Sequence, residues 1–267
     1  FDGGSVDSSK MNLNIDTQRN TVMTYNQSDR NLKIHLNGGN AAFNGKVFMT
    51  TPGLLDIEAI EHIYGSTNWS ANAANTTYGD GEGATEDVFN SNFEGLRVLS
   101  DSGGTDTLDA SAVAADAYGK HSIINLTPGT YSSINTYATD LEKITAVSLG
   151  DAGKIASFES ALATQNTAYS ASNSYYPGFT RTALYRGQQN VGIAHHTWIE
   201  NAKGGGGNDT ITGNNKGNEI TGNGGNDTID GSGGVDMAIY DEAYTNYTVS
   251  NAGGTVTVSH TGGSADE

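Results

Sequence analysis

The sequence has no cysteine and only three prolines in 267 residues. Without cysteine the chain can form neither disulfides nor thiolate metal sites, and three prolines cannot support a collagen-like repeat. Basic residues are also few, because 13 Lys and Arg stand against 30 Asp and Glu, for a formal net charge of −17. Such a chain repels phosphate backbones, so we exclude nucleic acid as a partner and expect a surface that attracts cations. No apolar run is long enough to span a bilayer, so no transmembrane segment is predicted.

Glycine is abundant, with 36 residues, and it separates short β-prone runs from residue 66 onward. Runs such as 95–99 and 121–126, divided by Gly, Asn and Asp turns, predict a mainly β fold. Residues 54–65 carry apolar side chains at helical spacing, and we expect the longest of two or three helices at about 54–64. Residues 153–163 also predict a helix, and 165–176 a surface loop.

A nine-residue period runs from Gly204 to Ile239 in four repeats, at 204–212, 213–221, 222–230 and 231–239. The side chains at position six are Asp209, Asn218, Asp227 and Asp236, and those at position eight are Ile211, Ile220, Ile229 and Ala238. Each repeat is expected to form a turn and a short strand whose middle side chain points inward, with two repeats to a coil. The sequence therefore predicts a parallel β-roll at about 204–240, with Asp209 and Asp227 stacked on one side and Asn218 and Asp236 on the other.

Glycines allow the turns to take positive φ and to direct carbonyl groups inward, where carboxylates join them. Such an all-oxygen set suits Ca²⁺, whereas the alternative is a Gly/Asn-rich linker. A second acidic glycine turn at 101–109, the upstream turn, predicts calcium as well, with an ordinary hairpin turn as the alternative. Because Asn218 is neutral and Lys216 replaces a glycine, we expect their side of the roll to bind calcium less tightly. The candidate calcium ligands are Asp101, Gly103, Gly104, Asp106, Glu200, Gly205, Gly207, Asp209, Asn214, Asn218, Gly222, Gly224, Asp227 and Asp236.

The nonapeptides resemble the RTX repeats of proteins exported by type I secretion. Three other segments resemble serralysin-type zinc metalloproteases of the metzincin group: 22–25 their Met-turn, 54–65 the helix that closes their protease domain, and 198–202 their lead-in to the first repeat. This resemblance implies that residues 1–66 are the C-terminal subdomain of a metzincin-like α/β protease domain. It implies that 67–267 form a β-domain with flanking β-sandwich strands, an insertion at about 136–185, and the roll.

In that family a H-E-x-x-H-x-x-G-x-x-H helix holds zinc, and this sequence has no such motif. The resemblance implies that the chain begins just downstream of that helix, so that Zn²⁺ belongs only to the intact parent protein. It implies that Met23 forms the apolar floor beneath the zinc, and that Tyr25, near the zinc, stabilises the oxyanion.

Two functions are carried forward as hypotheses. The first is the C-terminal portion of a secreted, calcium-stabilised serralysin-like zinc metalloendopeptidase, which cleaves protein or peptide substrates and uses a type I secretion apparatus. This segment alone is not expected to be catalytic, because one tyrosine is not a zinc site. The second is a non-enzymatic RTX-type calcium-binding protein of the extracellular surface or of adhesion, with a degenerate protease scaffold. A H-E-x-x-H motif upstream of Phe1 would distinguish the first from the second.

Overall fold

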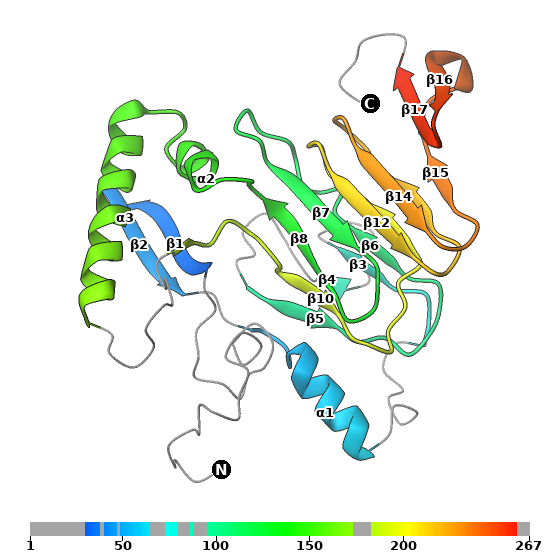
Figure 1. Ribbon diagram of the computed structural model, residues 1–267, viewed down its shortest axis with the longest axis horizontal. Coiled ribbons are helices and arrows are strands. Elements are labelled where there is room, and N and C mark those ends of the chain that lie inside the picture. The colour runs from blue at the N-terminus through cyan, green and yellow to red at the C-terminus, as the bar shows by residue number, and fades with distance from the viewer. Residues whose placement is uncertain are drawn as a thin grey trace.

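The computed structural model describes residues 30–37, 40–46, 49–64, 73–79, 86–87, 95–172 and 183–260. Strands dominate this part of the chain, and three α-helices and one short 3-10 helix accompany them. The prediction of a mainly β chain with few helices is therefore confirmed. Figure 1 shows two sheets in the centre, a helical unit at one end and a small hairpin at the other.

The centre consists of two six-stranded sheets. The strands of the first are β5 (Arg97–Leu99), β7 (His121–Asn125), β8 (Tyr131–Thr136), β10 (Val191–Ile193), β12 (Thr210–Asn214) and β14 (Thr228–Ser232), in the order β14-β12-β7-β8-β10-β5. The strands of the second are β3 (Thr77–Gly79), β4 (Glu86–Asp87), β6 (Thr107–Asp109), β11 (Asn201–Lys203), β13 (Glu219–Thr221) and β15 (Met237–Ile239), in the order β15-β13-β11-β6-β3-β4. The main core lies between these sheets.

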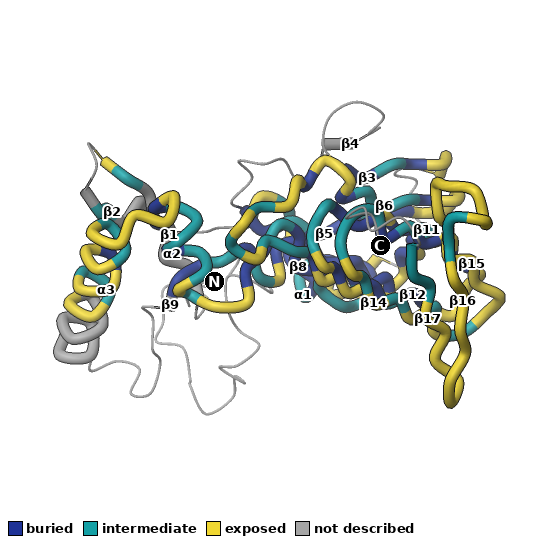
Figure 2. The backbone as a smooth tube through the Cα atoms, turned by 90° about the horizontal axis from the view of Figure 1, so that it is seen from above, coloured by how far each residue is buried: buried dark blue, intermediate teal, exposed yellow. Residues whose placement is uncertain are grey.

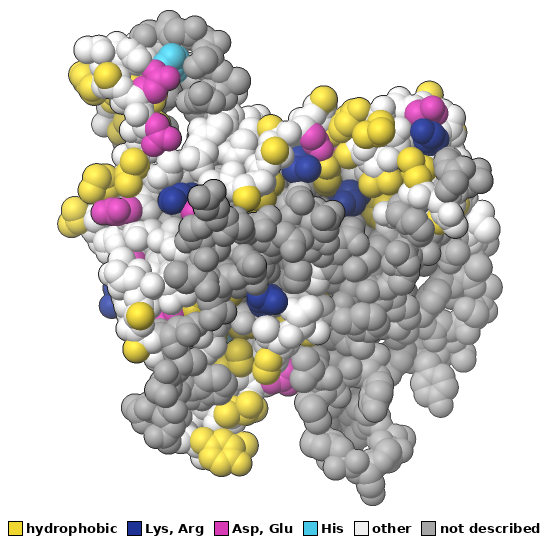
Figure 3. Space-filling view, turned by 180° about the vertical axis from the view of Figure 1, so that it is seen from behind, with side chains coloured by type: hydrophobic (Ala, Val, Ile, Leu, Met, Phe, Trp, Pro, Cys, Tyr) yellow, Lys and Arg dark blue, Asp and Glu magenta, His cyan; other side chains and the backbone are white. Residues whose placement is uncertain are grey.

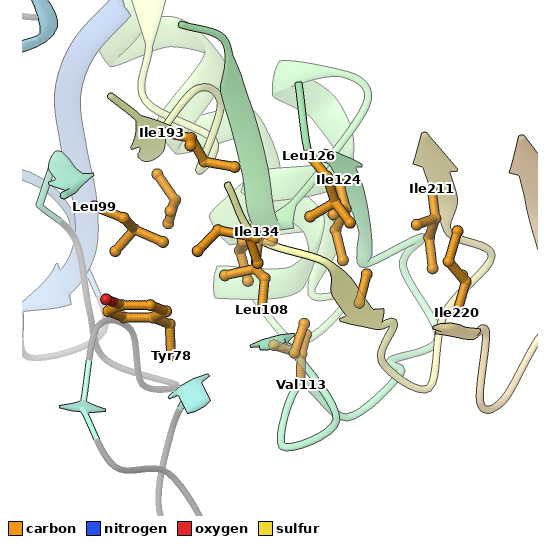
Figure 4. Packing of buried hydrophobic residues seen from close by; sticks show 14 residues of the cluster. Tyr78, Leu99, Leu108, Val113, Ile124, Leu126, Ile134, Ile193, Ile211 and Ile220 are labelled. Carbon is orange, nitrogen blue, oxygen red and sulfur yellow. The ribbon is translucent and has the colours of Figure 1, made fainter. Parts of the chain in front are cut away.

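The main core continues from the central strands into the roll without a break. Leu108, Ile124 and Ile134 are fully buried there, and Ile211 and Ile220 of the first two repeats join the same cluster. Figure 4 shows these side chains pointing toward one another from the two sheets. The apolar position eight therefore attaches the roll to the rest of the fold, because burial of each such side chain contributes about 1.5–3 kcal/mol.

The strand register confirms the predicted coil of two repeats. Ile211 of β12 pairs in parallel with Ile229 of β14, and Ile220 of β13 with Ala238 of β15. The side chain at position eight is less buried toward the C-terminal end of the roll, where Ile229 is half-buried and Ala238 is exposed. The reason is that β14 and β15 are the edge strands of their sheets, so no later coil covers them in the described part.

Helix α1 (Leu54–Tyr64) has the bounds that the sequence predicts. The Asp56 carboxylate accepts a hydrogen bond from Gly53 N at 2.8 Å, and Leu54 and Ile57 pack against Val98 of β5. The expectation that this helix is the longest is wrong, because α1 has 11 residues and α3 has 21.

Helix α3 (Ala152–Ser172) contains the predicted helix at 153–163 but also covers much of the predicted loop at 165–176. No glycine or proline interrupts the chain from Lys154 to Ser172, so nothing local ends the helix earlier. Phe158, Ile155 and Leu162 lie on one helix face and pack into a second core, which holds the helix in place.

This second core belongs to a small unit beside the central sheets. Strands β1 (Arg30–Asn37), β2 (Asn40–Lys46) and β9 (Ala183–Leu184) form a sheet in the order β2-β1-β9, and α2 (Asp140–Val147) and α3 accompany it. Ile34 of β1 packs with Ile144 of α2, Phe158 and Leu184. Most of the predicted insertion therefore packs onto strands from the start of the chain, at the end of the molecule opposite the roll (Figure 2). The predicted division at residue 66 remains a prediction.

The chain leaves the roll through a 3-10 helix, η2 (Tyr244–Asn246), into the hairpin of β16 (Tyr247–Ala252) and β17 (Thr255–His260). Tyr244, Val249 and Val256 expose about half or more of their surface there, and apolar side chains are visible on this part in Figure 3. None of the helices in the described ranges is both long and apolar enough to cross a membrane.

Candidate metal sites of the roll and the upstream turn

Backbone N–H groups hold the position-six carboxylates in place, from the same turn, from strand β7 or from the preceding coil. Asp209 is 2% exposed, and its carboxylate accepts hydrogen bonds from Ser122 N and Gly205 N, each at 2.5 Å. Asp227 accepts from the backbone N of Asp209 at 2.8 Å. The predicted stacking of Asp209 and Asp227 on one side of the roll is therefore confirmed.

Glycine at position one is required by this arrangement. A Cβ atom on Gly204 would lie 2.5 Å from Asp209 Oδ2 and would collide with Gly222 O of the next coil. A Cβ on Gly222 would collide with Asp227 Oδ2 in the same way. The absence of a side chain thus lets each carboxylate lie against its own turn, and at Gly204 it also leaves room for a carbonyl of the following coil.

Positive φ occurs in the third and fourth repeats, where the turns need it. Gly225 has φ +105° and Gly234 has φ +124°, and a Cβ on either would meet a carbonyl oxygen, Gly207 O or Lys216 O. Asn223 and Ser232 also adopt positive φ, at 67° and 66°. Among the predicted ligands, Gly207 therefore contributes a carbonyl that faces the next coil.

Without a cation, the charged forms of the stacked carboxylates are disfavoured. Burial raises the pKa of Asp227 to about 6, the hydrogen bond from Asp209 N opposes this, and the Asp209 charge adds to it. Burial likewise raises the pKa of Asp209, despite hydrogen bonds from Gly205 and Ser122. Asp209 is buried and Asp227 partly buried, and the protein favours the neutral form of each. A bound cation would reverse this preference.

The upstream turn places three acids together. Asp101 and Asp106 are 7% and 1% exposed, and Glu200 accepts a hydrogen bond from Asp106 N at 2.9 Å. Asp106 Oδ1 accepts from Thr76 N at 2.8 Å, but the buried Asp106 Oδ2 has no hydrogen-bond partner within the described part of the chain. Burial raises the pKa of Asp106 to about 6, with added repulsion from Asp101 and Glu200.

The glycines of this turn also adopt the positive φ that the sequence predicts for such turns. Gly103 and Gly104 have φ +151° and +126°, and a Cβ on Gly104 would lie 2.7 Å from Ala74 O. Residues that the sequence did not single out complete the turn, since Tyr78 donates its hydroxyl to Asp101 at 2.5 Å. No local signal could have identified Tyr78, because it comes from a separate strand that reaches the turn only through sheet pairing.

The other side of the roll differs. Asp236 accepts from Asn218 N at 3.0 Å, which confirms the predicted stacking there. Asn214 and Asn218, however, are buried amides that hydrogen-bond to each other and to backbone carbonyl groups. The side-chain oxygens of these two predicted calcium ligands therefore already accept hydrogen bonds. Their amide nitrogens cannot bind calcium.

The donor set as a whole fits calcium better than a transition metal. No group of three or more His, Asp and Glu side chains in the described ranges is arranged to hold a metal by itself. The carboxylates at Asp106, Asp209 and Asp227 would therefore need backbone carbonyls to complete an all-oxygen shell, as Ca²⁺ accepts. Met23 and Tyr25 lie outside the described residues, so the zinc-related prediction is not addressed by the structure.

Within the described part of the chain, no group of three or more His, Asp and Glu that could hold a metal includes a histidine. His196 Nδ1 lies 2.5 Å from Glu61 Oε2, and His195 Nε2 lies 3.8 Å from Glu58 Oε2. These pairs join the segment after β10 to helix α1, in agreement with a structural role.

Residues 203–238 match the family model of the RTX calcium-binding nonapeptide repeat, in four copies. No curated protein matches the chain. The family match, the eighteen-residue register and the stacked acids agree on the same segment. The chain therefore contains an RTX-type calcium-binding β-roll.

Proposed function

We propose that calcium is a folding cofactor of this chain, bound both between the turns of the roll and at the upstream turn. The observation that carries the proposal is Asp106, whose Oδ2 is buried without a hydrogen-bond partner beside two other acids. A buried carboxylate without a partner is costly, and proteins normally pair it with a charge or a metal. Calcium that binds only the folded turn would offset this cost and stabilise the fold by mass action.

The same reasoning applies to Asp209 and Asp227 in the roll. Their mutual repulsion adds to a chain whose formal net charge is already −17. The third and fourth repeats gain little from apolar burial, because Ile229 is only half-buried and Ala238 is exposed. Calcium supplies the attraction that this end of the roll lacks, so we expect its strands to form fully only when the ion is present.

The test is circular dichroism of the full chain, first treated with chelator and then titrated with calcium. Strand signal should increase with Ca²⁺ and much less with Mg²⁺, which requires a tighter octahedral shell. Full strand content in excess chelator would contradict the proposal.

A matched pair of variants tests the upstream turn. Asp106→Asn should raise the calcium concentration at the midpoint of the titration. Asp109→Asn is the control, because Asp109 already has partners in Lys203 Nζ at 2.9 Å and Ser111 N at 2.9 Å. Equal shifts of the midpoint in the two variants would argue against a calcium ion at Asp106.

We further propose that the protein acts outside the cell after export by a type I secretion apparatus. The support is the RTX repeat together with the expected dependence on calcium, because a roll that is incomplete in a calcium-poor cytoplasm suits export of an unfolded chain. A variant whose roll is stabilised without calcium should be exported more slowly than the wild type. Pulse labelling measures the rate of export. Unchanged export of such a variant would weaken this part of the proposal.

For the parent activity we propose a serralysin-like zinc metalloendopeptidase of which this chain is the C-terminal portion. The support is the resemblance of 22–25, 54–65 and 198–202 to segments of that family, in family order. The gene upstream of Phe1 should encode a H-E-x-x-H motif, and the 267-residue chain alone should not hydrolyse casein in the presence of zinc. Hydrolysis by this chain alone, or an upstream region without the motif, would refute it.

The second candidate is a non-enzymatic, calcium-binding surface or adhesion protein. The observation that favours it is the unit of α2 and α3 packed on β1, β2 and β9, because the resemblance to proteases includes no such insertion. Binding of the chain to whole cells or matrix, with no zinc motif upstream, is the expected result under this alternative.

A further inference from the structure

The second repeat departs from the other three at several positions of its turn. Asn215 and Lys216 stand where the others have glycine, and Asn218 stands where they have aspartate. Neither Asn214 nor Lys216 adopts positive φ, unlike Asn223, Ser232 and the glycines of the later turns. The turn at 213–218 is thus built differently from the turns of the third and fourth repeats.

The register shows what the position-six side chain of this repeat must face. Asp227 accepts from the backbone N–H eighteen residues earlier, at Asp209, and Asp236 does the same at Asn218. For Asn218 the residue eighteen positions earlier is Glu200.

The backbone N–H of Glu200 is not available to it, because it donates to Asp106 O at 3.1 Å. The group that faces Asn218 is instead the Glu200 carbonyl. A carboxylate there would meet another oxygen, whereas Asn218 Nδ2 donates a hydrogen bond to Glu200 O at 2.7 Å.

A second buried amide extends the same arrangement. Asn214 Nδ2 donates to Ile199 O at 2.8 Å and to Leu126 O at 3.2 Å. Asn214 Oδ1 accepts from Lys216 N at 2.9 Å and from Asn218 Nδ2 at 3.3 Å. Both asparagines are almost fully buried, at 3% and 1% exposed.

The charge around Asn218 also differs from the charge around Asp209. Lys216 Nζ lies over the Trp198 ring, 4.7 Å from its centroid, next to the segment 199–200 that the amides contact. A cation–π contact of this kind holds a fixed positive charge near the turn. A calcium ion would find no carboxylate at position six of the second repeat, three carbonyls that already accept hydrogen bonds from the two amides, and a lysine nearby.

We propose that Asn214 and Asn218 form an amide latch, a calcium-independent joint that closes the second repeat onto the segment 199–200. The proposal builds on the calcium function above, since it assigns calcium to the Asp209 side and to the upstream turn but not to the Asn218 side. The latch keeps β13 attached to β11 when calcium is absent, while β14 remains dependent on the ion. The first coil would then be a preformed base on which calcium completes the roll.

Hydrogen–deuterium exchange of the full chain, in calcium and in chelator, reads each strand separately. In the wild type, exchange at β13 should change little on chelation, whereas exchange at β14 should accelerate. Asn218→Ala should accelerate exchange at β13 about tenfold in both conditions, as expected for the loss of a buried hydrogen bond. Asn218→Asp should accelerate it in chelator and restore protection in calcium, because a carboxylate next to Glu200 O needs a cation.

Native mass spectrometry of the same samples counts bound calcium ions. Asn218→Ala should retain the wild-type number, and Asn218→Asp should bind one more. Loss of an ion from Asn218→Ala, or wild-type protection of β13 that depends on calcium as strongly as that of β14, would overturn the latch. If β14 and the calcium count of the wild type show no response to calcium, the proposed calcium function fails, while exchange at β13 in chelator still decides the latch.

Discussion

The three aspartates at position six should differ in their contribution to stability, although they are equivalent in the repeat. Asp209 is 2% exposed and accepts two backbone hydrogen bonds, from Ser122 and Gly205. Asp227 is partly buried and accepts one, from Asp209. Asp236 is exposed and accepts one, from Asn218 at 3.0 Å.

Replacement by alanine leaves these donors without an acceptor. A buried N–H that loses its partner costs about 1–3 kcal/mol. Asp209→Ala should therefore lower the free energy of unfolding by about 2–6 kcal/mol, since two donors are orphaned. Asp227→Ala should cost about 1–3 kcal/mol for its single donor. Asp236→Ala should cost about 0.5 kcal/mol, because water can replace an exposed acceptor.

The measurement is urea unfolding at saturating calcium, followed by circular dichroism, with the slope of the transition checked for constancy. Asp230→Ala is the matched control, because Asp230 is an exposed aspartate of the same roll whose carboxylate accepts from Ser232 N, two residues further along the same strand. Equal losses at Asp209, Asp227 and Asp236, or the largest loss at Asp236, would refute the reasoning. A large loss in the control would show that net charge, rather than these hydrogen bonds, decides stability.

Three further predictions concern packing, acidity and close approach. Gly204→Ala should lower the thermal unfolding temperature more than Gly253→Ala, because its Cβ meets Gly222 O, whereas a Cβ on Gly253 meets nothing within 4 Å and only its φ of +64° is unfavourable. A smaller effect at Gly204 would contradict this. In chelator, the unfolding temperature should fall as pH rises from about 4 to about 6, because Asp106, whose pKa is raised from 3.8 to about 6, holds more protons in the folded than in the unfolded state over that window. Calcium stabilisation should grow over the same window, since the ion binds the deprotonated acids, and an apo protein that gains stability with pH there would refute this assignment. Ile211→Ala should cost about 2–5 kcal/mol and Ile211→Val about 0.5–1.5 kcal/mol by chemical denaturation, because this side chain is fully buried, and a loss below 1 kcal/mol in the alanine variant would contradict its place in the core.

The length of the coil, the stacking of like positions and the choice of ion could all be inferred from the nine-residue period. Each repeat pairs with the repeat after next, so the contacts of Ile211 with Ile229 follow from counting residues. Helix α1 was likewise predictable, because its apolar spacing and its glycine at 65 are local signals.

For helix α3 the prediction from the local sequence was wrong over the second half of the helix. Its Ser- and Asn-rich second half looked like a loop, because these residues favour turns in isolation. The helix continues to Ser172 because its first half is anchored by Phe158 and no breaker follows. The partners of that anchor, Ile34 and Leu184, lie far away along the chain, so no local window contains them.

The repeat pattern alone therefore defines the roll and its calcium chemistry, since a strict period imposes its own register and brings like residues together. The roles of individual residues depend on neighbours from distant parts of the chain. Asp209 differs from Asp236 because Ser122 reaches it, and Asn218 is an amide where aspartate is usual because the N–H of Glu200 is already bound to Asp106 O. Such differences arise from sheet pairing between segments about 90 residues apart, and pairing of that kind is determined by the packing of the whole core rather than by any repeat.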